Sequence, residues 1–347
     1  MIALYRIELR LRSALGTPLS ADTLWGHIAW GIRYREGEEA LAAWLARHEL
    51  PEPPLILSDP MPRGYWPRPA VPPPPRPSTA PSAAEAQLRK QLAAIEWLPE
   101  DVWLALAEGL SSNKLFAAVK AALHKQPVRS VIAPQTHAGV NRLTGGTTAE
   151  DGGTLFATER RFFNAGAIGE SPRYVVWAYS PAESTLVQRW FEDGLIGGYG
   201  RDGANGAGWI EVLEVSTAAL PEVPNANAVV TLAPFTPKPG DPIGGFFRAG
   251  VRCGRLGGDF AIGPTPDGSS LRQKRPVASF LTGTLLACPP QDYPAGPPST
   301  VGRILAGVHR YADIRQYAAA VTLPCRLEDG LADHPLLNPA SQQEHAQ

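Results

Sequence analysis

Thirteen prolines fall within the 31 residues from Pro51 to Pro81, and four of them are consecutive from Pro72 to Pro75. Proline fixes φ and lacks an amide hydrogen, so this segment cannot form a helix or a central β-strand. We expect an extended polyproline II segment or an irregular loop. We interpret it as an insertion between regular elements. A proline-rich ligand for an aromatic groove is the alternative.

The residues before this insertion predict a strand followed by a helix. Apolar side chains alternate with charged ones in the opening segment, at Tyr5, Ile7, Leu9 and Leu11. A period of two places one face of a strand in the core. Gly16 and Pro18 should end this strand, and Ser20 is a suitable N-cap for a helix that Gly37 divides in two.

The pattern after the insertion completes a mixed α+β order. We expect helices at about 82–94 and 100–124, a long β-hairpin over 128–163, a strand at 174–179, a helix at 184–193 and a strand at 209–215. The order of a strand, a helix, strands, a helix and a strand is that of a ferredoxin-like (RRM-like) βαββαβ domain. Residues 225–324 repeat a β-rich pattern without helical periodicity. The prediction is two ferredoxin-like domains, 1–217 and an irregular 218–347.

Charge and cysteine content narrow the function classes. The net charge is −1, so binding to nucleic acid would need a local basic surface, and residues 231–281 hold seven Lys/Arg against three acids. Scattered solvated charges explain that excess equally well. Three separated cysteines without a C-x-x-C pair support neither a disulfide framework nor a zinc finger, and suggest small core residues in a reducing compartment.

Targeting, metal and cofactor signals are weak. No apolar run reaches 18 residues, and charges from Arg6 to Arg12 interrupt any signal peptide, so we expect a cytoplasmic protein. Asp22 and Asp151 would need a third ligand to hold a metal. We predict no cofactor.

Seven glycines crowd the 15 residues 194–208. Gly198, Gly200 and Gly203 spell G-x-G-x-x-G, but a dinucleotide fingerprint follows a strand and opens a helix, whereas here a helix precedes and a strand follows. Two interpretations remain: a mobile connection, or bare backbone amides that cradle a phosphate. Tyr199 or Trp209 could offer a stacking face, although we expect Trp209 to anchor the strand in the core.

Five segments in order resemble a known family. They are GTPLSADTLWGHIAW (16–30), HAGVNRLTGGTTAEDGGTLFATE (137–159), GGYGRDGANGAGW (197–209), PVASFLTGTLL (276–286) and YAAAVTLP (317–324). They resemble, respectively, the first strand-to-helix junction, the thumb hairpin, the glycine-rich loop and two parts of the second domain of subunit four of the Csm complex. That complex is the type III-A CRISPR effector, and the subunit belongs to the RAMP superfamily of RNA-binding proteins.

The resemblance implies two ferredoxin-like domains and a place at the base of the complex. Such a subunit caps the 5′ handle of the crRNA, contacts the large polymerase-type subunit and abuts the first backbone RAMP subunit. Its thumb wedges between guide and target RNA. The family is not the nuclease. Asp202 and Ala204 stand where relatives often have basic or hydroxyl residues, and the proline-rich insertion is longer than the pattern requires.

The candidate RNA contacts form four groups under this resemblance. At the junction, whose helix N-terminus can accept a phosphate, they are Gly16, Thr17, Ser20 and Asp22. In the glycine-rich loop they are Gly197, Gly198, Gly200, Arg201, Gly203, Asn205 and Gly206. In the thumb they are His137, Asn141 and Arg142, and in the second domain they are the phosphate contacts Lys274 and Arg275.

Two other functions stay open. The first is a metal-independent endoribonuclease that processes precursor crRNA with His27 or His137 as the general base. No spacing links either histidine to a catalytic partner, so a structural or RNA-contacting role is favoured for both. The second is a protein-binding scaffold that docks through the proline-rich segment.

Overall fold

The computed structural model describes residues 2–74, 82–127, 130–148, 150, 154–163, 171–261, 272–332 and 334–337. Its first sheet contains β1 (Ala3–Leu11), β2 (Ile56–Leu57), β8 (Arg173–Ser180) and β9 (Ile210–Thr217) in the order β2-β8-β1-β9. All neighbouring strands are antiparallel. The predicted strands at 5–11, 174–179 and 209–215 are confirmed as β1, β8 and β9.

Alternation along β1 explains which face of the sheet is buried. Ile7 and Leu9 are fully buried, as the period of two predicts. Glu8 departs from the pattern, because it is buried although it belongs to the charged set. Arg6 and Arg173 each lie 3.1 Å from its carboxylate. Burial opposes the charge of Glu8, but these arginines outweigh it and lower the pKa.

Helices α1 (Ala21–Glu36) and α6 (Ser184–Leu195) cross at two glycines. A Cβ atom on Gly31 would lie 2.8 Å from the backbone nitrogen of Gly194, and one on Gly194 would lie 2.9 Å from Ile28. Only glycine allows the two backbones this close, and the approach brings the start of the glycine-rich loop against α1. Gly37 ends α1 as expected, and α2 (Glu38–Ala46) and a 3₁₀ turn (Arg47–Glu49) follow.

The proline-rich segment is more regular than predicted. Besides β2 it contains β3 (Met61–Pro62), which also pairs with β8, and β4 (Tyr65–Pro67). Leu55, Leu57 and Met61 are buried in the core. Short strands at the edge of a sheet tolerate proline, which explains the error of expecting a loop throughout. Residues 75–81 lie outside the described residues.

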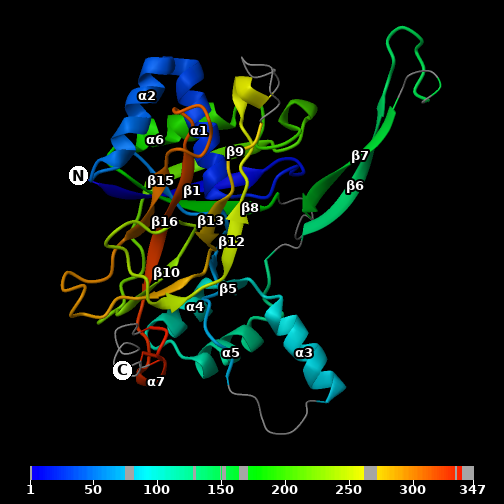
Figure 1. Ribbon diagram of the computed structural model, residues 1–347. Coiled ribbons are helices and arrows are strands. Elements are labelled where there is room, and N and C mark those ends of the chain that lie inside the picture. The colour runs from blue at the N-terminus through cyan, green and yellow to red at the C-terminus, as the bar shows by residue number, and fades with distance from the viewer. Residues whose placement is uncertain are drawn as a thin grey trace.

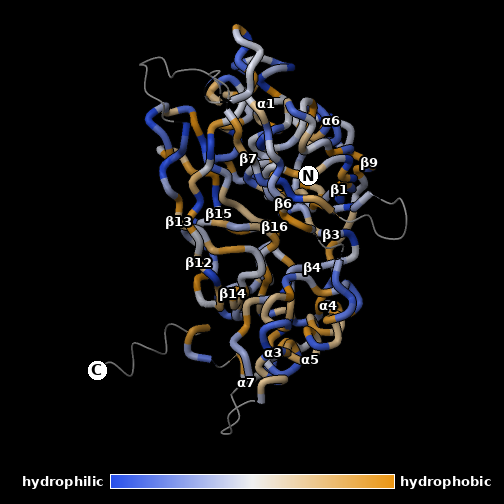
Figure 2. Tube along the Cα trace, turned by 90° about the vertical axis from the view of Figure 1, so that its right-hand side faces the viewer, coloured by the Kyte–Doolittle hydropathy of each residue, from blue (hydrophilic) through white to orange (hydrophobic). Residues whose placement is uncertain are grey.

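A separate helical group follows this segment. It contains α3 (Ala83–Ala93), β5 (Trp97–Pro99), α4 (Glu100–Ala107) and α5 (Ser112–Ala121), and β5 pairs with β4. The three helices gather at the end of the molecule away from α1 (Figure 1, Figure 2). The predicted hairpin is formed by β6 (Ser130–Gly139) and β7 (Thr154–Phe163), and it projects from the body (Figure 1).

The second sheet repeats the strand order of the first. Its strands are β10 (Ala228–Thr231), β11 (Gly245–Phe246), β14 (Leu285–Ala287), β15 (Thr300–Leu305) and β16 (Gln316–Cys325). The spatial order is β11-β14-β10-β16-β15. As in the first sheet, the strand that comes first in the chain (β10) lies between the third (β14) and the last (β16), and the second (β11) lies beside the third. β15 is added at the edge next to β16. After β9, the one α-helix among the described residues is α7 (Asp329–Ala332).

A ribbon of two strands lies outside both sheets. It consists of β12 (Ala249–Arg252) and β13 (Val277–Phe280), and a 3₁₀ turn at Gly258–Ala261 follows its first strand. A Cβ atom on Gly258 would lie 2.4 Å from the ring of Trp30, so the extension of this ribbon rests directly on α1.

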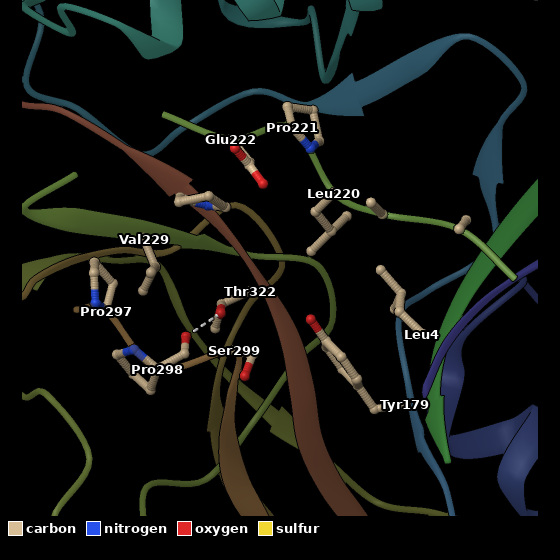
Figure 3. Close-up of a pocket in the computed structure, with 13 residues that line it drawn as sticks. Leu4, Tyr179, Leu220, Pro221, Glu222, Val229, Pro297, Pro298, Ser299 and Thr322 are labelled. Carbon is tan, nitrogen blue, oxygen red and sulfur yellow. Dashed lines mark hydrogen bonds between the residues drawn. The ribbon is translucent and has the colours of Figure 1, made fainter. Parts of the chain in front are cut away.

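The two sheets share one hydrophobic core. The hydroxyl of Tyr317 in β16 accepts a 2.6 Å hydrogen bond from the amide of Leu57 and donates to its carbonyl. A cavity of about 380 Å³ lies between Leu4 and Thr322, beside the segment that joins β9 to β10 (Figure 3). Cys288 and Cys325 are buried as expected, whereas Cys253 is exposed, which corrects its assignment to the core.

No described helix combines the length and apolar character that crossing a membrane requires.

Candidate nucleic-acid interface

The strand-to-helix junction and the glycine-rich loop are in direct contact. A Cβ atom on Gly16 would lie 2.3 Å from the carbonyl oxygen of Arg201, and one on Gly200 would lie 2.6 Å from Cβ of Thr17. Gly200 also has a φ of +71°, which side chains rarely adopt. The structure therefore brings together two of the four predicted groups of RNA contacts, in which Thr17 and Arg201 are 184 residues apart in sequence.

Most of the loop amides already have partners within the chain. Gly200 donates to Nε2 of His27 at 2.9 Å, and Arg201 donates to Oγ1 of Thr17 at 2.9 Å. Gly198 and Gly206 donate to the carbonyls of Leu195 and Gly203. These four amides are paired within the chain, so a phosphate at any of them would have to displace an internal hydrogen bond.

The glycines serve instead for close packing within the loop. Cβ atoms on Gly198 and Gly203 would each lie 2.7 Å from a carbonyl oxygen of the loop itself. Gly197 and Gly206 have positive φ but open space around them. Asn205 lies in a 3₁₀ turn, Gly203–Asn205, and its side chain is exposed. The outward surface of the loop therefore includes Gly197, Asn205 and Gly206, together with the exposed residues Arg201 and Ala204.

The two aromatic residues of the loop are placed opposite to expectation. Tyr199 is fully buried, and its hydroxyl donates to the carbonyl of Pro18 at 2.9 Å and accepts from the amide of Ser20 at 2.9 Å. It cannot offer a stacking face. Trp209, predicted to anchor the core, is 63% exposed and lies just before β9. The alternation of side chains within β9 does not tell which way Trp209 points, because the preceding loop sets the direction of that residue.

The N-terminus of α1 is occupied by the chain's own carboxylates. Oδ1 of Asp59 accepts the first helical amide, that of Ala21, at 2.8 Å, and its other oxygen accepts from Thr282 at 2.5 Å. Burial raises the pKa of Asp59 to about 6, despite these hydrogen bonds. A phosphate at this amide, as the sequence predicted, would have to displace Asp59, which came from the proline-rich segment and was missed.

Asp22 links α1 to the ribbon and to the second sheet. The guanidinium of Arg252 donates to its carboxylate at 2.7 and 3.1 Å, Gln316 donates at 3.2 Å and Ser20 donates at 2.6 Å. Burial opposes ionisation of Asp22, but these partners outweigh it and lower the pKa. The side chains of Asp22 and Ser20 are therefore engaged in contacts within the chain.

The two predicted cations of the second domain differ in role. Nζ of Lys274 donates to the carbonyl of Arg315 at 2.6 Å, and burial lowers its pKa to about 8 although Asp22 attracts the charge. Arg275 is exposed and donates to the carbonyl of Gly307 at 3.2 Å. Arg275 can reach an external phosphate, whereas Lys274 braces the loop before β16.

The hairpin carries its predicted residues away from the loop. Nε2 of His137 lies 2.9 Å from Oγ1 of Thr158, and its ring stacks on Phe156 with centroids 5.2 Å apart. Asn141 accepts a hydrogen bond from the amide of Leu143, and Arg142 is exposed near the tip.

At its root the hairpin is joined to the rest of the candidate surface. Leu15 and Arg161 exchange backbone hydrogen bonds of 3.0 and 2.8 Å. The guanidinium of Arg201 donates to the carbonyl of Glu159 at 2.6 Å. The junction, the loop and the hairpin root thus form one continuous surface.

Sequence reasoning missed the apolar character of the hairpin. At least two-fifths of the side-chain surface is exposed at Val131, Ile132, Val140, Leu143, Leu155, Phe156 and Phe162. An isolated two-stranded hairpin is marginally stable, and exposed apolar residues mark interaction sites. The signal was available, because both predicted strands contained apolar residues at odd and even positions. Among the described residues, no three acidic, histidine or cysteine side chains are placed to hold a metal.

No protein-family model and no curated protein sequence matches the chain. Solved structures match it in fold. A chain of the Csm3–Csm4 subcomplex in the type III-A CRISPR-Cas interference complex has a TM-score of 0.52 at 12% identity, over 93% of this chain and 99% of that one. A chain of the Csm1–Csm4 cassette in complex with pppApA has a TM-score of 0.50 at 15% identity, over 94% and 99%. The chain therefore has the fold of a subunit of Csm4-containing CRISPR-Cas assemblies, as the resemblance in its sequence predicted.

Proposed function

We propose that this chain is the Csm4-like, RNA-binding and non-catalytic subunit of a type III CRISPR effector complex. In this role it caps the 5′ handle of the crRNA, docks the large polymerase-type subunit and the backbone RAMP subunit, and places its hairpin as a thumb at the guide–target duplex. The observation that carries the proposal is the fold shared over nearly the whole chain with structures that have Csm4 in common.

The arrangement of the strands supports the fold that the role requires. Both sheets have their second, third, first and last strands in that spatial order, which is the order of a ferredoxin-like domain. We propose two such domains, 1–217 and 218–347, with helices α1 and α6 retained in the first. The linker between β9 and β10 is their boundary.

The exposed groups of the candidate surface suit RNA more than a catalytic reaction. Trp209, Asn205 and Arg142 face outward on the loop and the hairpin, and Arg275 is exposed just before β13 of the ribbon. An aromatic face with amide and guanidinium donors binds single-stranded RNA by stacking and phosphate contact. In this proposal the packed glycines hold that surface in shape rather than touch the phosphate.

The endoribonuclease alternative has little support in the surroundings of its two histidines. Nε2 of His27 accepts the Gly200 amide, and its ring also bonds to the backbone of Gly194. A general base needs a free ring nitrogen within reach of the substrate hydroxyl. His137 lies on the hairpin with its Nε2 on Thr158. Among the described residues, neither histidine is hydrogen-bonded to an acidic side chain.

Reconstitution tests the proposal. The full chain is co-expressed with a large polymerase-type subunit, a backbone RAMP subunit and a crRNA, and the purified complex is irradiated to crosslink protein to RNA. The proposal expects the chain to co-purify and to crosslink to the 5′ handle. Specific cleavage of repeat RNA by the chain alone, lost in His27→Ala or His137→Ala, would establish the ribonuclease instead.

A further inference from the structure

A groove of about 780 Å³ opens at the root of the hairpin. The junction at Leu15 and Pro18, the segment from the end of α3 to β5, and the hairpin root at Arg161 and Phe163 line it. The proline-rich segment, the residues that follow α5 and Tyr174 of β8 complete the lining. Its volume lies within the range of pockets that hold a small molecule or one nucleotide. None of the predicted RNA contacts accounts for this groove or for the helical group that forms one wall.

The lining combines flat apolar faces with groups that form hydrogen bonds. Trp97 and Phe163 contribute aromatic rings, and Phe163 packs edge-on against Tyr174 with centroids 6.1 Å apart. Gln91 and Glu96 supply amide and carboxylate groups on the α3 side. An unstacked RNA base needs this pairing of a ring face with donors and acceptors for its edge.

Arg161 gives the groove a fixed positive charge. Its guanidinium donates to Oγ of Ser130 at 2.7 Å, and its backbone is held by Leu15. In the part of the chain that the structure describes, Arg161 forms no ion pair. A guanidinium that is held in place and lacks a carboxylate partner is suited to bind a phosphate.

We infer that this groove holds one unstacked nucleotide of a bound RNA, with its base against Trp97 and Phe163 and its phosphate at Arg161. The inference rests on the proposed RNA binding and specifies a subsite for it. The groove is continuous with the candidate surface, because Leu15 adjoins Gly16 and Arg201 is bonded to Glu159, two residues from Arg161. An apolar peptide segment in the groove would leave the charge of Arg161 uncompensated, so RNA is the favoured occupant.

Two adjacent alanines allow a matched test. Ala94 is exposed and lines the groove, whereas its exposed neighbour Ala93 does not line it. Ala94→Trp fills the groove without removing a core side chain, and Ala93→Trp adds the same ring outside it. Gln91→Trp blocks the groove from a second position. All three proteins are checked for unchanged thermal unfolding before use.

The dissociation constant of the full chain for a fluorescent single-stranded RNA is measured by anisotropy. We expect Ala94→Trp and Gln91→Trp to weaken binding about 10-fold, the order expected for one lost stacked base, and Ala93→Trp to bind like the unmodified chain. RNA carrying a single 4-thiouridine should crosslink to peptides that contain Trp97 or Phe163, and Ala94→Trp should remove that crosslink.

The outcomes separate the subsite from the general proposal. If the unmodified chain binds RNA and both blocking variants bind equally well, the subsite inference fails while RNA binding stands. If the unmodified chain binds no RNA, alone or in the complex, both fall. If the blocking variants keep RNA affinity but lose co-purification with another subunit, the groove is a protein-docking site and the inference is overturned.

Discussion

The amide of Gly200 donates a 2.9 Å hydrogen bond to Nε2 of His27. The ring of Tyr199 stacks on the same imidazole, with centroids 5.3 Å apart. Burial lowers the pKa of His27, against the opposing effect of its bond to the Gly194 backbone, so the neutral ring persists as an acceptor. This histidine therefore holds the glycine-rich loop against α1.

Replacing His27 by alanine should destabilise the fold, although His27 is not one of the proposed RNA-contacting residues. The change leaves the Gly200 amide without an acceptor and removes the ring that Tyr199 packs on, which costs about 1–3 kcal/mol. Urea unfolding followed by circular dichroism measures the loss. His124→Ala, which removes an exposed ring, is the control and should change stability by less than about 0.5 kcal/mol. Equal stability of the two variants would contradict the structural role.

Two glycines of the loop should respond very differently to alanine. Gly208 and Gly206 both have positive φ, +69° and +81°. A Cβ atom on Gly208 would lie 2.1 Å from the carbonyl oxygen of Tyr199, whereas one on Gly206 meets nothing within 4 Å. Gly206→Ala pays only for the left-handed backbone, about 1 kcal/mol. Gly208→Ala must also displace the backbone of Tyr199, so its loss in urea unfolding should be at least twice as large.

Asp59 should make the protein more stable as pH falls, whereas a carboxylate whose pKa is lowered by folding makes a protein less stable as pH falls. Its pKa is raised to about 6 by burial, above the value of about 3.9 in an unfolded chain. Between these values the folded protein binds the proton more tightly, so this group makes unfolding harder as pH falls from about 6 to 4. At pH 8 the folded carboxylate costs stability.

Asp59→Asn isolates that effect. Its amide oxygen can accept from Ala21 and its NH₂ group can donate to Thr282, so both contacts remain. We expect the variant to be more stable than the unmodified chain at pH 8, by about 2–3 kcal/mol, with the advantage vanishing near pH 4. Urea unfolding at several pH values gives the difference curve. A variant that is less stable at every pH would show that the ionised carboxylate is favourable.

Local periodicity predicted the elements of the first sheet well. The alternation in 5–11 and the cap at Ser20 correctly indicated β1 and α1, because both depend on residues close in sequence. The hairpin and α6 were also found, since each has its own pattern between glycine or proline breaks. The second sheet was less clear, because β10, β11 and β14 have four residues or fewer and long irregular segments separate several of its strands.

The candidate surface depends on contacts that no local pattern encodes. Asp59 caps a helix 38 residues before it, and Arg252 binds Asp22 across 230 residues. Tyr199 and Trp209 are both aromatic residues next to glycines, so the sequence does not distinguish them. Tyr199 is buried and its hydroxyl is bonded to Pro18, whereas Trp209 is exposed. Residue types identified the right loop, but only the packing assigns which of its groups face outward.

Trp209 is the loop residue most suited to stack on a base. It is 63% exposed, while its backbone is fixed, because its amide donates to Oγ of Ser13 and its carbonyl accepts from the amide of Arg12. Trp209→Ala should therefore leave thermal stability nearly unchanged and weaken binding to single-stranded RNA about 5- to 10-fold, because one aromatic–base stack is lost. Anisotropy with a labelled RNA measures the change. Ile196→Ala, at an apolar side chain that is 77% exposed before the same loop, is the control for loss of surface area. If both variants weaken binding alike, the effect is general surface loss, and Trp209 provides no specific stacking face.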